Sequence, residues 1–351
     1  MANHQTYNFA IVKYQQSDKA RWNEFVDNHE NGTFFHLAEW AELIKDVFSH
    51  TPRYILAKNS KTGDVLGVLP LVEQKSKLFG HSLISTPFCV YGGAIAHNDR
   101  IREALENKAL EIGQKLLVDY VELRNKAEVY NKNFDRFCHH STFGGLIPDG
   151  RDNILAGVKK KQRANIRHSF KKALDIRIDD DAETAYDIYS ESVRNLGTPV
   201  FHPQYFPSLF KHFGDKVNVL TVESNGKPVS SVLSFYYKDE VLPYYGGGTT
   251  SARTLKSNDL MYFELMCHAH QRGCQYFDFG RSKDDSGAFK YKATWGMQPE
   301  PLHYMRALVK ATEHPNLSPN NPKYALVINT WKKLPLWVSR VIGPYLSKYL
   351  G

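Results

Sequence analysis

The sequence predicts an α/β protein of two similar parts, each a mixed β-sheet flanked by helices, and two observations carry that prediction. A Tyr-Gly-Gly segment occurs at Tyr91 and again at Tyr245, an offset of 245 − 91 = 154 residues. A strand of the pattern Tyr-apolar-acid-apolar begins at Tyr120 and again at Tyr276, an offset of 276 − 120 = 156. Two such matches in the same order indicate a tandem duplication. A duplication suits a chain of 351 residues, which is too long for one ordinary core.

The composition is that of a globular protein, with 42% hydrophobic and 13% aromatic residues. A formal charge of +8 is compatible with an anionic ligand or membrane surface without requiring either. The scattered cysteines fit neither a redox pair nor a zinc site. Because no secretory signal and no long apolar run are visible, we expect a reduced cytoplasmic protein without a spanning helix.

The first part alternates between extended and helical patterns. The helix expected at 34–48 rests on Trp40, Ile44 and Phe48, which recur at four-residue spacing. In order, we expect a strand at 9–14, helices at 18–28 and 34–48, a strand-turn-strand unit at 53–76, a strand ending at 93, a helix at 98–117 and a strand at 119–125.

The second part repeats this order. We expect a strand-turn-strand unit at 217–237, a strand at 241–248, a helix at 257–272 and a strand at 275–280. In both parts a strand-helix-strand crossover is expected to be right-handed and to pair its strands in parallel. The turn-forming cluster 148–150 places the boundaries at 1–150 and 151–312, followed by a helical tail at 313–351.

Three stretches carry a family resemblance: FFHLAEW at 34–40, the basic helix KKQRANIRHSFKKAL at 160–174, and YFDFGRSKDDSGAFKYKATWG at 276–296. The order hairpin, strand, helix, strand resembles the GNAT acyltransferase fold, and two copies with these stretches resemble the FemAB (Fem transferase) family. The tail WKKLPL…IGP at 331–344 is similar to the subgroup associated with exosortase (PEP-CTERM) and exopolysaccharide gene clusters.

The resemblance implies two tandem GNAT-like domains and an acyl- or aminoacyltransferase that acts on an amine of a cell-envelope or exopolysaccharide precursor. The donor would be aminoacyl-tRNA or acyl-CoA, and neither a metal nor a further cofactor is required. Acyl-CoA enzymes of the GNAT type usually carry a Q/R-x-x-G-x-G/A turn before the crossover helix, and neither repeat has it. Two alternatives stay open: an acyl-CoA-dependent N-acyltransferase, and a non-catalytic binding protein for an anionic glycan or lipid-linked precursor.

The stretch 276–296 holds most of the candidate site residues. Asp278 is the candidate general base, and a salt bridge to Arg281 or a nearby lysine is its alternative role. A loop would present Arg281 and Ser282 to an anion. Lys290 and Lys292 lie in a second short alternating, extended segment. Lys292 matches the Fem position after Phe, here replaced by Tyr, so the resemblance implies that it stabilises a developing oxyanion or holds a phosphate.

The Fem Lys position precedes an aromatic-Gly pair, which makes Trp295 a further substrate-binding candidate. Tyr244, Tyr245 and Gly247 form the second Tyr-Gly-Gly segment. Glycine there allows close approach of a ligand or of a neighbouring strand.

The basic helix supplies Arg163 and Arg167, which lie four residues apart on one face. The corresponding helix of Fem transferases begins the second domain, so the resemblance implies contact with donor or acceptor phosphates, tRNA included. A solvated helix face is the alternative. In the first part, His36 and Trp40 lie four apart on one expected helix face; Trp40 suits the core, and His36 suits either a cleft or a structural role.

Glu122 and Arg124 are the first-part counterparts of the candidate site and are structural if the duplicated fold keeps one working site. The tail from Tyr324 to Leu350 mixes apolar and basic residues, which suits peripheral contact with an anionic membrane or packing against the second part. Pro335 and Pro344 interrupt its periodicity.

Overall fold

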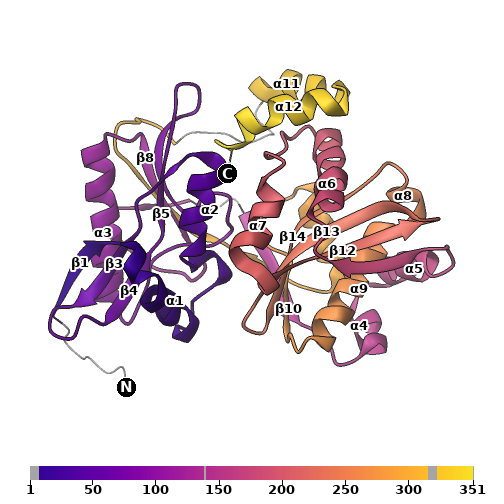
Figure 1. Cartoon of the computed structure of the whole chain (residues 1–351), viewed down its shortest axis with the longest axis horizontal. Coiled ribbons are helices and arrows are strands. Elements are labelled where there is room, and N and C mark those ends of the chain that lie inside the picture. Colours follow the sequence, from indigo (N-terminus) through magenta and orange to yellow (C-terminus); the bar gives the residue numbers. More distant parts are fainter. Residues whose placement is uncertain (1–7, 138–139, 315–321, 351) are drawn as a thin grey trace. The chain divides into compact units, whose positions relative to one another are not determined.

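The computed structural model describes residues 8–137, 140–314 and 322–350, and internal contacts divide the chain into two compact units (Figure 1). Unit 1 is formed by Met1–Cys138 and Leu302–Pro315, and unit 2 by His139–Pro301 and Asn316–Leu350. This division differs from the boundaries expected near 150 and 312. A strand in the segment Leu302–Pro315, between the two segments of unit 2, returns to a sheet of unit 1.

Unit 1 contains two sheets, in the orders β1-β3-β4-β7 and β2-β5-β6-β8-β18-β9. Its elements are β1 (Phe9–Lys13), α1 (Lys19–Asn28), α2 (Glu39–Phe48), β2 (Thr51–Pro52), β3 (Ile55–Asn59), β4 (Val65–Leu69), β5 (Leu71–Ser76), β6 (Gly80–Ser85), β7 (Ile95–Ala96), α3 (Asp99–Leu116), β8 (Tyr120–Asn125), β9 (Asp135–Arg136) and β18 (His303–Leu308).

Helix α3 forms where the capping and apolar patterns agree. The Asn98 side chain accepts the Ile101 amide at 3.0 Å and begins the helix, and Leu117 in the left-handed conformation ends it. Ile101 and Leu105 are buried, and a Cβ at Gly67 of β4 would come within 3.1 Å of both side chains. Glycine at 67 therefore lets α3 lie close to the sheet.

The helix predicted at 34–48 is wrong in its first turn. Residues 34–36 form a separate 3-10 turn (η2, Phe34–His36), and α2 begins at Glu39. The Thr33 amide donates to His36 Nδ1 at 3.2 Å and closes that turn, while Leu37 takes an extended ψ of 140°. His36 and Trp40 therefore do not share a helix face.

Unit 2 has one sheet in the order β11-β12-β13-β14-β15-β10-β16, with β17 also paired to β10. Its elements are β10 (His140–Leu146), α4 (Arg151–Gly157), α5 (Lys160–Ser169), β11 (Asp175–Asp179), α6 (Ala182–Leu196), α7 (Tyr205–Phe213), β12 (Val217–Ser224), β13 (Lys227–Tyr237), β14 (Glu240–Gly248), α8 (Ala252–Leu255), α9 (Ser257–Gln271), β15 (Tyr276–Asp278), β16 (Ser282–Lys283), α10 (Gly287–Lys292), β17 (Pro299–Pro301), α11 (Pro322–Lys333) and α12 (Leu336–Ser347).

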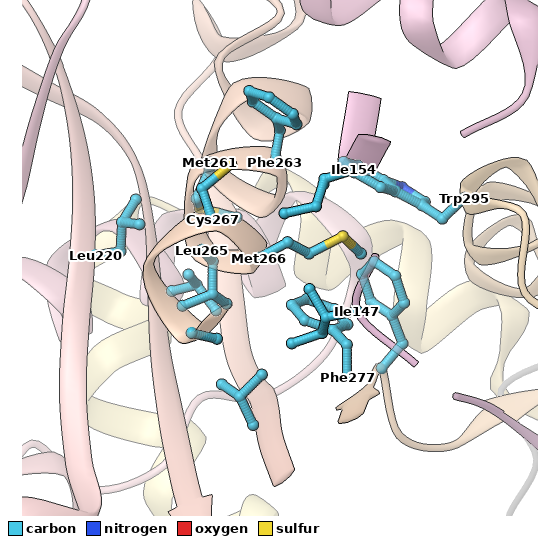
Figure 2. Packing of buried hydrophobic residues seen from close by; sticks show 14 of the residues in the cluster. Ile147, Ile154, Leu220, Met261, Phe263, Leu265, Met266, Cys267, Phe277 and Trp295 are labelled. Carbon is cyan, nitrogen blue, oxygen red and sulfur yellow. The ribbon is translucent and has the colours of Figure 1, made fainter. Parts of the chain in front are cut away.

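Helices cover both faces of this sheet. A Cβ at Gly247 would meet Ser192 of α6, whereas one at Gly246 would meet Tyr262 of α9, and successive residues of a strand point to opposite faces. The face toward α9 holds the main core of the unit, in which Figure 2 shows Met266 and Phe277 among the buried side chains.

The predicted fold class is confirmed. In unit 1, β6 and β8 pair in parallel with α3 between them in the sequence; in unit 2, β14 and β15 pair in parallel across α9. The remaining sheet pairings are antiparallel, so each unit has a mixed sheet flanked by helices.

Two local predictions in unit 2 need correction. The segment expected to be extended after residue 287 is helical, because the Ser286 hydroxyl accepts the Phe289 amide at 3.1 Å and begins α10. The basic helix, expected over 160–174, ends at Ser169.

Candidate functional site

The parallel strands β14 and β15 separate soon after they pair. Their register covers two positions, Glu240 with Tyr276 and Val241 with Phe277; β14 then continues to Gly248, whereas β15 ends at Asp278. Ligands of α/β sheets bind at carboxyl ends of strands where neighbouring strands part. The residues after β15 therefore form the candidate site.

Asp278 is fixed at this strand end. Its carboxyl is buried, and Oδ1 accepts hydrogen bonds from Thr142 Oγ1 at 2.9 Å and from the Gly280 amide at 2.7 Å. Thr142 lies on β10, the strand that pairs with β15. Gly280 has a φ of +67°, so glycine suits the turn that brings its amide to the carboxylate.

Lys292 holds the same turn through the backbone carbonyl groups of that turn. Its ammonium donates to the carbonyl oxygens of Phe279, Gly280 and Arg281 at 2.7, 2.9 and 3.1 Å. Burial lowers the pKa of Lys292 to about 8, against the opposing charge of Asp278. Three carbonyl oxygens match the three donors of an ammonium group. These contacts favour a positioning role for Lys292, and its role toward an oxyanion or phosphate stays a prediction.

The other predicted residues of this stretch differ in exposure. Ser282 is buried, and its hydroxyl has no hydrogen-bond partner within the ranges that the structure describes. Arg281 is half-buried and Lys290 is exposed. Beside Ser282, the Ser141 hydroxyl donates to Asp284 at 2.7 Å. The strand end thus combines a fixed carboxylate with a buried hydroxyl.

A second buried carboxylate lies under α10. Asp259 Oδ1 accepts from Gln162 Nε2 at 2.7 Å and from the Tyr291 hydroxyl at 2.9 Å. Burial and the nearby Asp259 raise the pKa of Tyr291 well above its usual value. The Tyr that replaces the Fem Phe at position 291 thus ties α10 to α9. Sequence reasoning missed Asp259 and Gln162, since single polar residues on helices give no distinctive pattern.

Trp295 packs into this region as a core residue. Its ring lies 5.6 Å from that of Phe279 and 5.9 Å from that of Tyr262, and its side chain is buried (Figure 2). The Tyr262 ring that Trp295 contacts is also away from water, and this burial raises the pKa of Tyr262 to about 12. Trp295 therefore fixes α10 against the end of β15.

The second Tyr-Gly-Gly segment serves packing. Tyr245 is buried in an aromatic cluster, with its hydroxyl 2.7 Å from that of Tyr205, and burial raises its pKa well above the usual value. Tyr244 is half-buried at a β-bulge of β14. At Gly247 a Cβ would come within 2.7 Å of the Ser192 Cβ, so this glycine admits α6 rather than a ligand.

The two arginines of the basic helix α5 have different surroundings. Arg163 Nη2 donates to the carbonyl oxygens of Ala156 and Val158 at 2.8 and 3.1 Å, which caps the end of α4. Arg167 is exposed, and the structure gives it no hydrogen bond or ion pair within the described ranges. Arg167 is therefore the arginine of this pair whose charge is available to a ligand.

In unit 1 the counterpart of the candidate site is a buried ion-pair network. Glu122 Oε1 accepts from Arg124 Nε at 3.0 Å, and Oε2 accepts from Arg306 Nε at 3.1 Å. Although burial by itself raises the pKa of Glu122, the charges of the two arginines outweigh burial and bring it to about 2. The predicted structural role of Glu122 and Arg124 agrees with these contacts.

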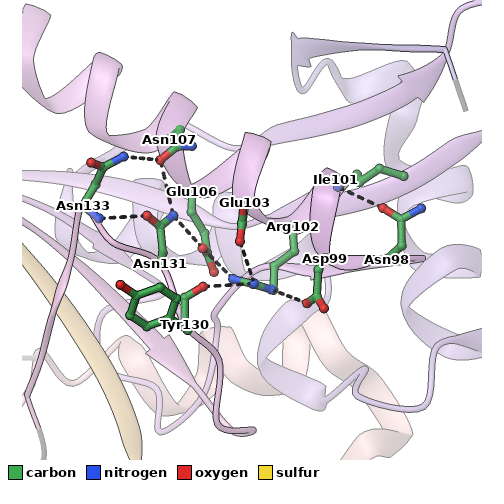
Figure 3. Close-up of polar contacts among 10 residues, drawn as sticks. All are labelled: Asn98, Asp99, Ile101, Arg102, Glu103, Glu106, Asn107, Tyr130, Asn131 and Asn133. Atoms are coloured by element: carbon green, nitrogen blue, oxygen red, sulfur yellow. Dashed lines mark hydrogen bonds and ion pairs between the residues drawn. The ribbon is translucent and has the colours of Figure 1, made fainter. Parts of the chain in front are cut away.

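A cavity of about 590 Å³ opens within unit 1, and His36 and Asn125 are among its lining residues. His36 Nε2 donates to the Gly93 carbonyl at 2.9 Å, so the ring also holds the first Tyr-Gly-Gly segment. Beside the cavity, Arg102 Nη1 donates to Glu106 at 2.7 Å, within the polar network of Figure 3. Trp40 is buried away from solvent in the aromatic core.

Comparison with known proteins identifies the fold. The family model of the acetyltransferase (GNAT) domain matches residues 160–293, which hold α5, β14, α9 and α10. This match, together with the solved structures that follow, shows that the fold is that of a tandem GNAT protein.

Among solved structures, FemX is 15% identical with a TM-score of 0.64, and the match covers 91% of this chain and 100% of FemX. A tandem GNAT protein from the clavulanic acid biosynthesis pathway is 10% identical with a TM-score of 0.57, covering 87% of this chain and 100% of that one. The C-terminal domain of a putative lysylphosphatidylglycerol synthetase from Agrobacterium fabrum is 11% identical with a TM-score of 0.55, covering 83% and 91%. No curated protein matches in sequence.

Proposed function

We propose that unit 2 transfers an acyl or aminoacyl group to an amine on a cell-envelope or exopolysaccharide precursor, as a FemAB-type transferase. The observation that carries the proposal is the fixed carboxylate of Asp278 at the point where β14 and β15 separate. The GNAT domain match at 160–293 and the fold similarity to FemX support the same activity. The exosortase-associated subgroup would place the acceptor in exopolysaccharide assembly.

In the proposed reaction the acceptor amine attacks the carbonyl carbon of the donor ester or thioester. A C–N bond forms, the bond from the carbonyl carbon to the leaving oxygen or sulfur breaks, and the leaving group departs with a proton. Asp278 would receive the proton of the attacking amine, because a general base must lie at a fixed position beside the nucleophile. Its bonds to Thr142 and Gly280 supply that fixed position.

Lys292 would act by holding the peptide segment 279–281, since its three donors are used on those carbonyl oxygens. Immobilising the turn keeps the amide of Gly280 directed at Asp278 and keeps Ser282 at the strand end. In this proposal Ser282 and Arg281 contact the substrate. The oxyanion that forms during acyl transfer requires preorganised hydrogen-bond donors. The donor that we assign to this role is the hydroxyl of Ser282, which is buried and directly follows the turn 279–281 in the sequence.

For the donor we favour aminoacyl-tRNA. The basic helix α5 presents the exposed Arg167, and a helix with many cations suits a phosphate backbone. Acyl-CoA is the alternative. It is less well supported, because Gly246 and Gly247 admit Tyr262 and Ser192 and no phosphate-binding turn precedes α9.

The test supplies purified protein with charged tRNA or acyl-CoA and an amino-sugar acceptor, and detects the amide product by mass spectrometry. We expect product with charged tRNA, and a loss of at least a hundredfold in Asp278→Asn, consistent with the usual contribution of a general base. Arg167→Glu should raise the KM for tRNA, whereas Arg253→Glu, an exposed arginine on α8, should not. Full activity of Asp278→Asn would contradict the proposed base.

The cavity of unit 1 favours a second candidate function, the binding of an anionic glycan or lipid-linked precursor without catalysis. Lys126 and Arg102 line it. In that case no donor would give an amide product, but a glycan fragment would bind saturably. Binding would survive Asp278→Asn and be lost in Lys126→Glu.

A further inference from the structure

The small residues of α12, the last helix of unit 2, point toward the rest of that unit. Ser339, Gly343 and Ser347 are buried and recur every four residues along α12, on the side that contacts α6. The approach is close, because a Cβ at Gly343 would come within 2.9 Å of the backbone nitrogen and oxygen of Val200. The packing surface of α12 is therefore made of residues with little or no side chain.

The large apolar residues of α12 point to solvent. Trp337, Val341 and Tyr345 are 70%, 60% and 70% exposed, and they also recur every four residues. Each lies two residues from a buried small residue, which is about 200° around a helix. Ile342 is exposed too, and on α11 so are Leu326 and Val327. An ordinary surface helix has the opposite arrangement.

Polar contacts hold α12 in this orientation. Arg340 Nε donates to the Ser190 hydroxyl at 2.9 Å, and Arg340 Nη2 lies 2.9 Å from the Asp187 carboxylate. Arg194 Nη1 donates to the Leu334 carbonyl at 3.1 Å. Rotating α12 to bury Trp337 would break these contacts and bring bulky side chains where Gly343 fits. The packing of α12 therefore keeps Trp337, Val341 and Tyr345 exposed to solvent.

The charged side chains of the segment 322–351, which includes α11 and α12, all have one sign. Residues 322–351 contain Lys323, Lys332, Lys333, Arg340 and Lys348 and no aspartate or glutamate. Lys332 and Lys333 are exposed. Positive charge around a group of apolar side chains complements an anionic surface that has an apolar interior, which is the chemistry of an anionic bilayer.

We infer that the exposed side of α12, the outer tail face formed by Trp337, Val341, Ile342 and Tyr345, binds an anionic lipid bilayer. Tryptophan and tyrosine concentrate at the membrane–water interface because their rings are apolar and their N–H and O–H groups are polar. The helix would lie in the plane of the membrane surface. Within the described ranges, no helix has the length and hydrophobicity to span a bilayer. The inference does not depend on the proposed transferase activity.

Tryptophan fluorescence of the full chain tests it directly. All five tryptophans lie in the described ranges, and Trp22, Trp40, Trp295 and Trp331 are buried. Quenching by acrylamide therefore reports mainly on Trp337. With vesicles of phosphatidylcholine and phosphatidylglycerol we expect a blue shift and at least tenfold less quenching of the exposed component. Pure phosphatidylcholine vesicles should give a much smaller change.

Vesicle co-sedimentation with variants gives the second measurement. The triple variant Val341→Ser, Ile342→Ser, Tyr345→Ser should lose at least tenfold in vesicle affinity with an unchanged Tm, because these side chains make little internal contact. Lys332→Glu with Lys333→Glu should remove the preference for phosphatidylglycerol. The control, Leu78→Ser with Tyr130→Ser, removes two exposed apolar residues of unit 1 and should bind as the wild type does.

Equal binding by wild type and triple variant would overturn the inference, as would no binding at millimolar lipid. A third outcome would also overturn it. If the wild type forms a dimer that the triple variant does not, measured by light scattering, the outer tail face is an interface between copies of this chain.

Discussion

Glu122 of β8 and Arg306 of β18 form a buried ion pair although 184 residues separate them in the sequence. The whole of β10 to β17 lies between them in the chain. Arg124 completes the network, so one carboxylate is shared by two guanidinium groups. The sheet of unit 1 that contains β8 therefore depends on a charge supplied by a strand that follows β17 of unit 2 in the sequence.

Replacing Glu122 by glutamine should lower the free energy of unfolding by about 3–5 kcal/mol, because two buried arginines lose their counter-charge. Urea denaturation at pH 7 measures it. Glu128→Gln, at an exposed glutamate paired with Arg136, is the control and should change stability by less than about 1 kcal/mol. Similar losses in both variants would show that burial does not strengthen the Glu122 network.

The same carboxylate predicts an acid dependence. The pKa of Glu122 is about 2 in the folded protein and 4.5 as its ordinary value, so its stabilising effect is complete above pH 4.5. The effect is lost as the pH falls through 2. The difference in stability between wild type and Glu122→Gln should therefore shrink between pH 4.5 and 2. A constant difference across that range would contradict the lowered pKa.

Lys292→Met should loosen the turn after β15. Hydrogen bonds to a charged group contribute about 1.5–3 kcal/mol, so amide hydrogen exchange at residues 280–282 should accelerate by about 10- to 100-fold. Lys290→Met, two residues away and exposed, is the matched control and should leave exchange unchanged. Unaltered exchange in Lys292→Met would mean that the ammonium does not hold this turn.

Lys292 also predicts an alkaline effect. Its pKa is lowered to about 8 from 10.5, so between these values the unfolded chain binds a proton that the folded chain has released. The free energy of unfolding of the wild type should therefore rise relative to Lys292→Met as the pH increases from 8 to 10.5. Denaturation at pH 7.5, 9 and 10 measures it, and a falling difference would mean that the folded pKa is not lowered.

Thr142→Val should remove one of the two bonds to Asp278 Oδ1 and leave the carboxylate less well positioned. For the proposed transferase we expect kcat to fall at least tenfold with little change in KM, and stability to fall by about 1 kcal/mol. Thr221→Val, which removes a buried hydroxyl elsewhere in the sheet, should cost similar stability without the loss of kcat. Equal kcat values in the two variants would exclude a positioning role for Thr142.

The repeated order of strands and helices was predictable because it depends on local patterns. Alternation gave β13 and β14, and the Asn98 cap with the apolar spacing of Ile101 and Leu105 gave α3 within one residue. The parallel pairing of β14 with β15 followed from the helix expected between them, because a strand-helix-strand crossover joins parallel strands. In these segments local preference and tertiary packing agree.

The sequence was less informative where side chains decide the local structure. The break before α2 arises from the bond between Thr33 and His36, and the helix α10 from the cap at Ser286. The Asp278 site was predicted as a carboxylate at a strand end. Its partner Thr142 was not, because β10 is 136 residues away in the sequence and no pattern links the two positions.

The position of β18 has a consequence for how the protein is made. When residues 1–150 have emerged from the ribosome, the chain up to β8 and β10 is available for folding. The strand β18, which pairs with β8 along Tyr120–Asn125, has not yet been synthesised. Until residue 308 emerges, that edge of β8 has open backbone groups, and Glu122 lacks Arg306. The first half of the gene therefore encodes an incomplete domain, and unit 1 finishes folding after the chain of unit 2 up to β17 has been synthesised.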